Sequence, residues 1–329
     1  MELKRSLLFR LLILAGGATW LCSPGAAQKS SQPPPTPEQV AQQLPPPMPP
    51  PTPEQAAQAD QRQGAYAEVN GARIFYQVAG SGTPLLLIHG FPLSGQLFQF
   101  QLEGLSNQFQ VITPDLRGFG KSEAPSPNAS TATYARDMLA LLDQLGVRTA
   151  IIGGHSMGGQ VALEMYNEAP ERFAGMLLIG TNPMAASFVE QGQWRGYRRQ
   201  AATAGVPSIV PIAEPQLLTG ATRAFDAARS TTMMNILAEA SVNGVLGGGQ
   251  ALATRPDYTG LLGSIAVPTL VLVGLEDPVY AFPISQMTHA AIPGARLAVV
   301  PGASHAVIFE RPELANDAIR SWAATAVAR

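Results

Sequence analysis

Residues 150–159 read AIIGGHSMGG, and they carry the strongest structural signal in the chain. The apolar run at residues 150–152 predicts a buried strand, and the residues after the glycine-rich part predict a helix. A sharp turn must join the two elements, and Gly154 and Gly158 leave the backbone room for it. A strand–turn–helix of this kind is typical of a turn that projects a side chain, here the Ser156 hydroxyl, above the end of a sheet.

The chain from residue 65 onward alternates strands and helices in the same way. Asn70-Gly71 lies between two short runs and is typical of a type I′ hairpin turn. Short apolar runs without polar alternation indicate strands covered on both faces. These runs lie at residues 84–88, 109–112, 150–152, 176–179, 269–273 and 297–300, and helices are expected at 133–145, 159–169, 283–291 and 312–327. With the hairpin they predict an α/β class fold with a mostly parallel, eight-stranded sheet.

One interval interrupts this alternation. Residues of about 183–262 read as helices and turns, and we expect them to form a helical cap over the carboxyl edge of the sheet, where open α/β sheets bind ligands. The three glycines at 247–249 leave two readings open, a hinge or a plain turned loop. Five side chains of the cap are candidates to line a substrate pocket, with core packing as the alternative for each: Trp194, Tyr197, Phe225, Met233 and Met234.

The first 64 residues differ in composition from the rest. Residues 1–27 combine a basic start, an apolar stretch at 11–21 and small side chains at 25–27, which is typical of a signal peptide. We therefore expect export, to the periplasm or beyond, with an uncleaved membrane anchor as the alternative and no stable membrane span after cleavage. Residues 28–64 hold 11 of the 29 prolines and few side chains that could form a core, which predicts a disordered proline-rich linker. The catalytic domain would then be residues 65–329.

Composition narrows the possible partners and cofactors. The chain of 329 residues has 21 Lys and Arg against 23 Asp and Glu, and its net charge of −2 does not indicate a nucleic-acid partner. A single cysteine rules out an internal disulfide framework and a cysteine-based zinc site. We expect neither a metal nor an organic cofactor, and the oligomeric state stays open.

Two backbone N–H groups are candidates to stabilise an oxyanion beside Ser156. The Met157 N–H lies at the start of the helix that follows the turn. The segment His89-Gly90-Phe91-Pro92 follows the strand at 84–88, and its loop should face the turn, so the Phe91 N–H is the second candidate. We expect His89 to hold this loop by hydrogen bonds rather than to act as a base.

The base and the acid should come later in the chain. His305 follows the last predicted strand, and Asp277 follows the strand at 269–273, so the two complete the chain order Ser, Asp, His. The adjacent Glu276 is the alternative acid. We assign no catalytic role to His155 or His289.

With these motifs the chain resembles the α/β-hydrolase superfamily over residues 65–329, and residues 115–122 match that superfamily's D-x-R-G-x-G-x-S segment. The resemblance implies a structural role for this segment beside the His89 loop. The haloalkane dehalogenase and epoxide hydrolase branches of the superfamily carry aspartate at the position of Ser156. The serine therefore argues against those two reactions. The loop at 89–94 resembles cofactor-free haloperoxidases and perhydrolases, whereas the Asp115 segment and Trp194-Arg195 resemble 3-oxoadipate enol-lactonases.

The expected function is therefore hydrolysis of a small-molecule ester or lactone by an exported enzyme with a Ser-His-Asp triad. Perhydrolysis or halogenation at the same triad is the alternative reaction. A ligand-binding module without catalysis is the alternative of another class, although such a module would not need all three triad residues. The sequence does not fix the acyl chain length.

Overall fold

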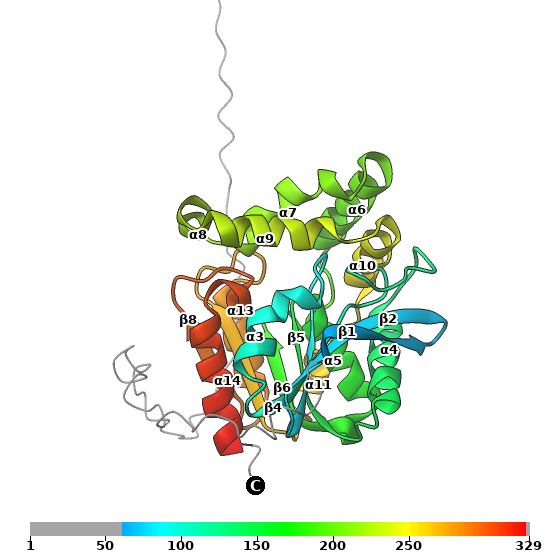
Figure 1. Cartoon of the computed structure of the whole chain (residues 1–329). Coiled ribbons are helices and arrows are strands. Elements are labelled where there is room, and N and C mark those ends of the chain that lie inside the picture. The colour runs from blue at the N-terminus through cyan, green and yellow to red at the C-terminus, as the bar shows by residue number, and fades with distance from the viewer. Residues whose placement is uncertain (1–60, 327–329) are drawn as a thin grey trace, which may run out of the picture. The chain divides into compact units, whose positions relative to one another are not determined.

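The computed structural model describes residues 61–326 (Figure 1). The predicted signal peptide and nearly all of the predicted linker lie outside the described residues. Residues 61–64, however, belong to strand β1 (Gln61–Val69), which pairs with β2 (Ala72–Ala79) from Gln61 opposite Val78 onward. The predicted end of the linker at residue 64 is therefore too late. Residues 61–64 are mostly polar, and their sequence does not indicate that their backbone pairs with β2.

The eight strands of the described residues form one sheet, which confirms the predicted class. The remaining strands are β3 (Thr83–Ile88), β4 (Phe109–Pro114), β5 (Ala150–His155), β6 (Phe173–Ile179), β7 (Thr269–Gly274) and β8 (Arg296–Val300). Their order is β1-β2-β4-β3-β5-β6-β7-β8. β2 runs opposite to the other strands and pairs antiparallel with both β1 and β4, whereas β3 to β8 run parallel to one another. In the hairpin, Asn70 and Gly71 both have positive φ (47° and 72°), as a type I′ turn requires.

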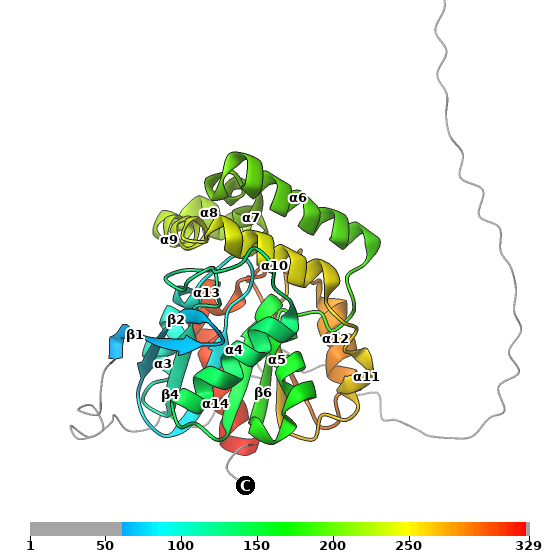
Figure 2. The ribbon, with the colours of Figure 1, turned by 90° about the vertical axis from the view of Figure 1, so that its right-hand side faces the viewer.

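Helices cover both faces of the sheet, which is why the strands read as unbroken apolar runs (Figures 1 and 2). Along β3, Leu86 and Ile88 join the core cluster under α4 (Thr131–Gln144) and α5 (Met157–Glu168). Leu85 and Leu87 join the opposite cluster, under α3 (Gln99–Gly104) and α14 (Pro312–Ala326). The chain also forms α12 (Phe282–Ala291), α13 (Val307–Glu310) and the 3₁₀ helices η1 (Gly95–Phe98), η2 (Pro170–Arg172) and η3 (Val206–Ser208).

The interval between β6 and β7 is helical, and most of it lies beyond one end of the sheet. Its helices are α6 (Phe188–Ala204), α7 (Val210–Leu217), α8 (Gly220–Phe225), α9 (Ala227–Ala238), α10 (Val242–Thr254) and α11 (Thr259–Leu262). The first five form the cap, whereas α11 lies low beside α12 (Figure 2). The two ends of the insertion meet where the Tyr258 N–H donates to the Pro183 carbonyl (2.8 Å). The cap therefore ends before α11, earlier than residue 262.

The three glycines at 247–249 are neither hinge nor loop, because they lie in the interior of α10. A Cβ atom on Gly248 would lie 2.8 Å from atoms of both Phe91 and Phe119, and one on Gly249 would lie 2.7 Å from Arg198 of α6. The glycines therefore let α10 approach both the loop after β3 and helix α6. A hinge or loop is predicted because glycine has a poor helix propensity, and close packing can outweigh that propensity.

We expect Gly248→Ala to destabilise the protein by about 1–3 kcal/mol, because the added methyl group meets two rings in a packed core. Gly192→Ala is the matched control, since Gly192 lies in α6 with nothing within 4 Å of an added Cβ. There, alanine should stabilise by up to about 1 kcal/mol through helix propensity. Urea unfolding of both variants measures the difference. A Gly248→Ala protein as stable as Gly192→Ala would contradict the packing described.

Candidate active site

Ser156 occupies the turn between β5 and α5, at the carboxyl end of a central strand. Its φ of 54° is unusual for a residue with a side chain, and its N–H donates to the Ile179 carbonyl of β6 (2.9 Å). A Cβ on Gly154 would lie 2.0 Å from Gly158, and one on Gly158 would lie 2.0 Å from the Ile88 carbonyl oxygen. Both glycines are therefore required for the close approach of strand, turn and helix that presents Ser156.

Asp277 and His305 meet above the carboxyl ends of β7 and β8. His305 Nδ1 lies 2.7 Å from Asp277 Oδ2, and the side chains are 4% and 0% exposed. Asp277 Oδ1 accepts the N–H groups of Val279 (2.8 Å) and Tyr280 (2.9 Å). Since the carboxylate can only accept, Nδ1 carries the proton and Nε2 is left as the basic nitrogen. The neighbouring Glu276 is exposed, so the structure brings Asp277 and not Glu276 to His305.

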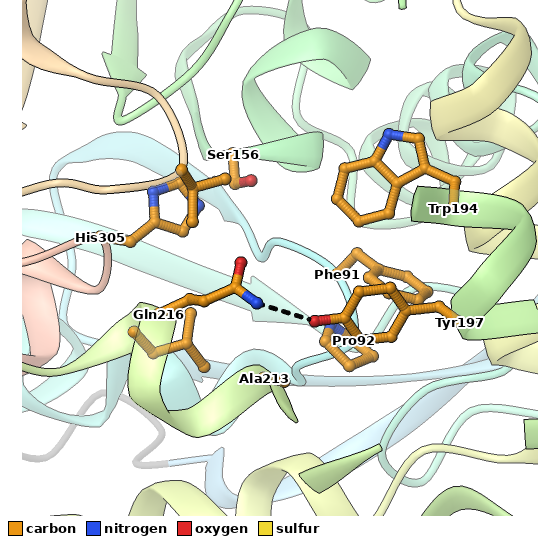
Figure 3. A pocket seen from close by; sticks show the side chains of 10 residues that line it. Phe91, Pro92, Ser156, Trp194, Tyr197, Ala213, Gln216 and His305 are labelled. Atoms are coloured by element: carbon orange, nitrogen blue, oxygen red, sulfur yellow. Dashed lines mark hydrogen bonds between the residues drawn. The ribbon is translucent and has the colours of Figure 1, made fainter. Parts of the chain in front are cut away.

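Ser156 and His305 line one cavity beneath the cap (Figure 3). Within residues 61–326, no direct hydrogen bond joins their side chains. Hydrogen bonds between nucleophile and base are commonly long in proteins without substrate and shorten when it binds. The three residues predicted to act together are thus gathered at one place from three different strand ends.

The two predicted N–H donors lie beside Ser156. Met157 is the first residue of α5, so its N–H has no acceptor one turn earlier in the helix. The loop carrying Phe91 follows β3, which pairs with β5. This loop is close to the nucleophile, because a Cβ on Gly90 would lie 2.9 Å from the Cβ of Ser156.

His89 holds this loop, as the sequence predicts, and the Asp115 segment supports it, as the resemblance implies. The Leu116 N–H donates to His89 Nε2 (2.9 Å), and His89 Nδ1 lies 2.8 Å from the Gly90 carbonyl oxygen. Asp115 accepts the N–H groups of Gly95 (2.7 Å) and Lys121 (2.8 Å). Burial lowers the pKa of His89 from 6.5 to about 4, and burial raises the pKa of Asp115 from 3.8 to about 6.

These two pKa shifts have opposite effects on stability. Between pH 6.5 and 4 the unfolded chain protonates His89 and the folded protein does not, so this group lowers stability as the pH falls. Between pH 6 and 3.8 the folded protein protonates Asp115 and the unfolded chain does not, so this group raises stability as the pH falls. His155, like His89, lowers the stability of the folded protein as the pH falls, because burial lowers its pKa well below 6.5.

We therefore expect opposite changes when these two groups are made non-titratable. The comparison is the fall in unfolding free energy from pH 7 to pH 5. In His89→Gln this fall should be about 2 kcal/mol smaller than in the wild type, and in Asp115→Asn it should be about 1 kcal/mol larger. Urea titrations of both variants and the wild type at the two pH values give these differences. Parallel pH dependence in all three proteins would contradict the assignment.

His155, for which no catalytic role is predicted, is packed against the base. Its ring centroid lies 4.6 Å from that of His305, and its Nε2 lies 2.9 Å from the His305 carbonyl oxygen. Because a carbonyl only accepts, Nε2 carries the proton of His155. Burial, and next the charge of His305, lower the pKa of His155, so the ring supports His305 without competing for its proton. In the sequence, the one indication of this contact with His305 is that His155 directly precedes Ser156. His289, in α12, lies near the Ala295 carbonyl (3.2 Å) and outside the cavity lining.

The cavity is small, with a volume of about 30 Å³, and its wall is mostly apolar. Its lining includes Trp194 and Tyr197, two of the five predicted pocket residues. The other three lie elsewhere: Phe225 is 90% exposed at the end of α8, Met234 is 39% exposed on α9, and Met233 is buried in the core. Hydrophobicity did not distinguish these environments. The remaining lining residues are Phe91, Pro92, Ala213, Gln216, Leu217 and Val279, of which only Phe91 was singled out in the sequence, for its backbone N–H.

Two further properties concern cofactors and membranes. Within the described residues, no group of three or more His, Cys, Asp or Glu side chains is placed to hold a metal ion. Across residues 61–326, no helix combines the length and the apolar character needed to cross a bilayer.

Comparisons with known proteins agree with this fold. A family model described as the alpha/beta hydrolase fold matches residues 83–312. The chain is 28% identical over 256 residues to the AB hydrolase superfamily protein YisY of Bacillus subtilis (strain 168), which covers 76% of this chain and 94% of that protein. It is 28% identical over 271 residues to a non-heme haloperoxidase of Rhodococcus erythropolis, covering 77% and 96% of the two chains. Among solved structures, a thermophilic esterase of Thermogutta terrifontis with malate bound has 30% identity and a TM-score of 0.78, covering 81% of this chain and 100% of that chain.

Proposed function

The chain belongs to the alpha/beta hydrolase family, and on this premise we propose that it hydrolyses carboxylic esters or lactones through an acyl-enzyme on Ser156. The observation that carries the proposal is the 2.7 Å contact of Asp277 with His305 Nδ1, which leaves His305 Nε2 as a base in the cavity lined by Ser156. The likeness to the Thermogutta terrifontis esterase supports an ester as the substrate.

In the first step, Ser156 Oγ attacks the ester carbonyl carbon while His305 Nε2 takes its proton. The carbonyl oxygen becomes an oxyanion, which the N–H groups of Phe91 and Met157 stabilise, a contribution of about 3–4 kcal/mol for one such donor. Asp277 keeps the imidazole in the required tautomer and stabilises its positive charge. The imidazolium then protonates the leaving alcohol oxygen, and the acyl group stays on Ser156.

In the second step, His305 removes a proton from a water molecule, whose oxygen attacks the acyl carbon. The same two N–H groups stabilise the second oxyanion. When it collapses, the bond to Ser156 Oγ breaks, Oγ recovers its proton from His305, and the acid leaves. In a lactone the alcohol and the acid are parts of one molecule, so the product is a hydroxy acid.

We further propose that residues 1–27 direct export and that residues 28–64, apart from the end paired in β1, space the catalytic domain from its surroundings. This rests on composition alone. Mass spectrometry of the protein secreted by its host would give the mature N-terminus, which we expect after Ala27. An N-terminus at Met1 on membrane-bound protein would contradict it.

A p-nitrophenyl ester series tests the proposed reaction. We expect turnover of the acetate and butanoate esters and a decline at the octanoate ester, because the small cavity beside Ser156, of about 30 Å³, favours short acyl groups. Release of p-nitrophenol is followed by absorbance. No turnover of any ester above the uncatalysed rate would contradict the proposal and favour a ligand-binding module without catalysis.

A second candidate reaction uses the same site. The Rhodococcus erythropolis relative is a non-heme haloperoxidase, and hydrogen peroxide in place of water would release the acyl group of Ser156 as a peracid, which oxidises bromide. The discriminating assay is bromination of phenol red that requires both acetate and peroxide. Good ester hydrolysis without such bromination would remove this candidate.

A further inference from the structure

Two polar side chains of the cap interrupt the apolar wall of the cavity. Gln216, near the end of α7, donates from Nε2 to the hydroxyl of Tyr197 in α6 (3.1 Å) and to the Ile212 carbonyl (3.0 Å). A carbonyl oxygen only accepts, so the amide nitrogen of Gln216 must face Ile212. This fixes the orientation of the amide, and Figure 3 shows its oxygen turned toward the side of the cavity where Ser156 and His305 lie.

This arrangement leaves one acceptor and one donor without protein partners. Within residues 61–326, no group donates to Gln216 Oε1, and the Tyr197 hydroxyl, which accepts from Gln216, has no acceptor for its own proton. Burial raises the pKa of Tyr197, so the hydroxyl keeps that proton. The rest of the cavity wall is largely apolar and offers these two atoms little else to bind.

The pair is held in place relative to the proposed base. Ser304 Oγ donates to the Gln216 carbonyl (3.2 Å), and the Ala306 N–H donates to the Leu217 carbonyl (2.9 Å). Ser304 and Ala306 flank His305, so the end of α7 is bound to the loop that carries the base. Glu310 strengthens this link by accepting from the Ser304 N–H and from Thr219, just after α7. A polar group in this position can select substrates, because these bonds position it relative to the reacting atoms.

We propose that Gln216 and Tyr197 recognise a hydroxyl or secondary amide group of the substrate, so that the preferred esters or lactones carry such a group close to the carbonyl. The inference rests on the proposed function and specifies its substrate class. A hydroxyl can donate to Gln216 Oε1 and accept from Tyr197, and an amide can do the same through its N–H and C=O. A plain alkyl chain in this place would displace water from both atoms without forming a hydrogen bond to either.

The test compares methyl esters matched in length. One pair is methyl 3-hydroxybutanoate and methyl butanoate, and the other is methyl N-acetylglycinate and methyl pentanoate. A pH-stat gives kcat/KM for each, and the ratio within each pair is the readout. We expect the wild type to favour the hydrogen-bonding member of at least one pair by about tenfold or more, and the favoured pair tells a hydroxyl from an amide.

Variants connect this ratio to the two side chains. Gln216→Leu removes the acceptor and should bring the favoured ratio to about one, and Tyr197→Phe, which keeps the ring, should lower it several-fold. Gln193→Leu, on the exposed face of α6, is the matched control and should keep the wild-type ratio. Wild-type ratios near one, or an unchanged ratio in both cavity variants, would overturn the inference while ester hydrolysis stands. Failure of the wild type on all four esters would instead count against the proposed function.

Discussion

Ser156→Ala should lower kcat/KM for p-nitrophenyl butanoate by about ten-thousand-fold or more, because the variant has no oxygen that can carry the acyl group. The residual rate should come from binding and from the two oxyanion N–H groups, which the substitution leaves in place. Initial rates at high enzyme concentration, with the uncatalysed rate subtracted, give the measurement.

The control for this variant separates chemistry from folding. Ser156 has a strained φ of 54° with or without its hydroxyl, so the urea midpoint of Ser156→Ala should stay close to that of the wild type. Ser264→Ala, at an exposed serine after α11, should keep both activity and stability. Activity of Ser156→Ala within tenfold of the wild type would show that the nucleophile is another group.

Asp277→Asn should lower kcat by about ten-thousand-fold with a small change in KM. The amide can donate to His305 Nδ1 and thereby hold the imidazole in the wrong tautomer, with the proton on Nε2. Loss of the carboxylate also removes the charge that stabilises the imidazolium. Single-turnover and steady-state rates with the same ester separate kcat from KM.

The neighbouring carboxylate gives the matched control. Glu276 is adjacent in sequence and exposed, so Glu276→Gln should change kcat less than about twofold. The contrast between the two variants tests the geometry, since their side-chain chemistry is nearly the same. An equal loss in both, or a loss only in Glu276→Gln, would contradict the assignment of Asp277 as the partner of His305.

Much of the fold could be predicted because strong local signals coincide with the sheet. The strand at 150–152 and the glycines after it specify the turn at Ser156, and the apolar runs specify strands covered on both faces. Asp277 and His305 could be located because each follows such a run, and parallel strands end at one edge of a sheet. The pairing of β7 with β8 then brings the two loops side by side, which allows the 2.7 Å contact between them.

The rest depends on packing that a linear sequence does not express. The glycines at 247–249 read as a loop, whereas contact with Phe91 and Arg198 makes them part of a helix. Phe225 and Trp194 look equivalent in the sequence, yet one is 90% exposed and the other lines the cavity. Nothing in the sequence indicates that Gln216 lines the cavity, because its position depends on how α7 is bound to the loop of His305.

Labelling with a fluorophosphonate probe tests the proposed mechanism most directly, because the probe reacts only with an activated nucleophile. After digestion, mass spectrometry should find one adduct, on the peptide that contains Ser156, in the wild type but not in Ser156→Ala or after heat denaturation. Labelling should also fall sharply in Asp277→Asn. An adduct at another residue, or active protein that the probe does not label, would contradict the account.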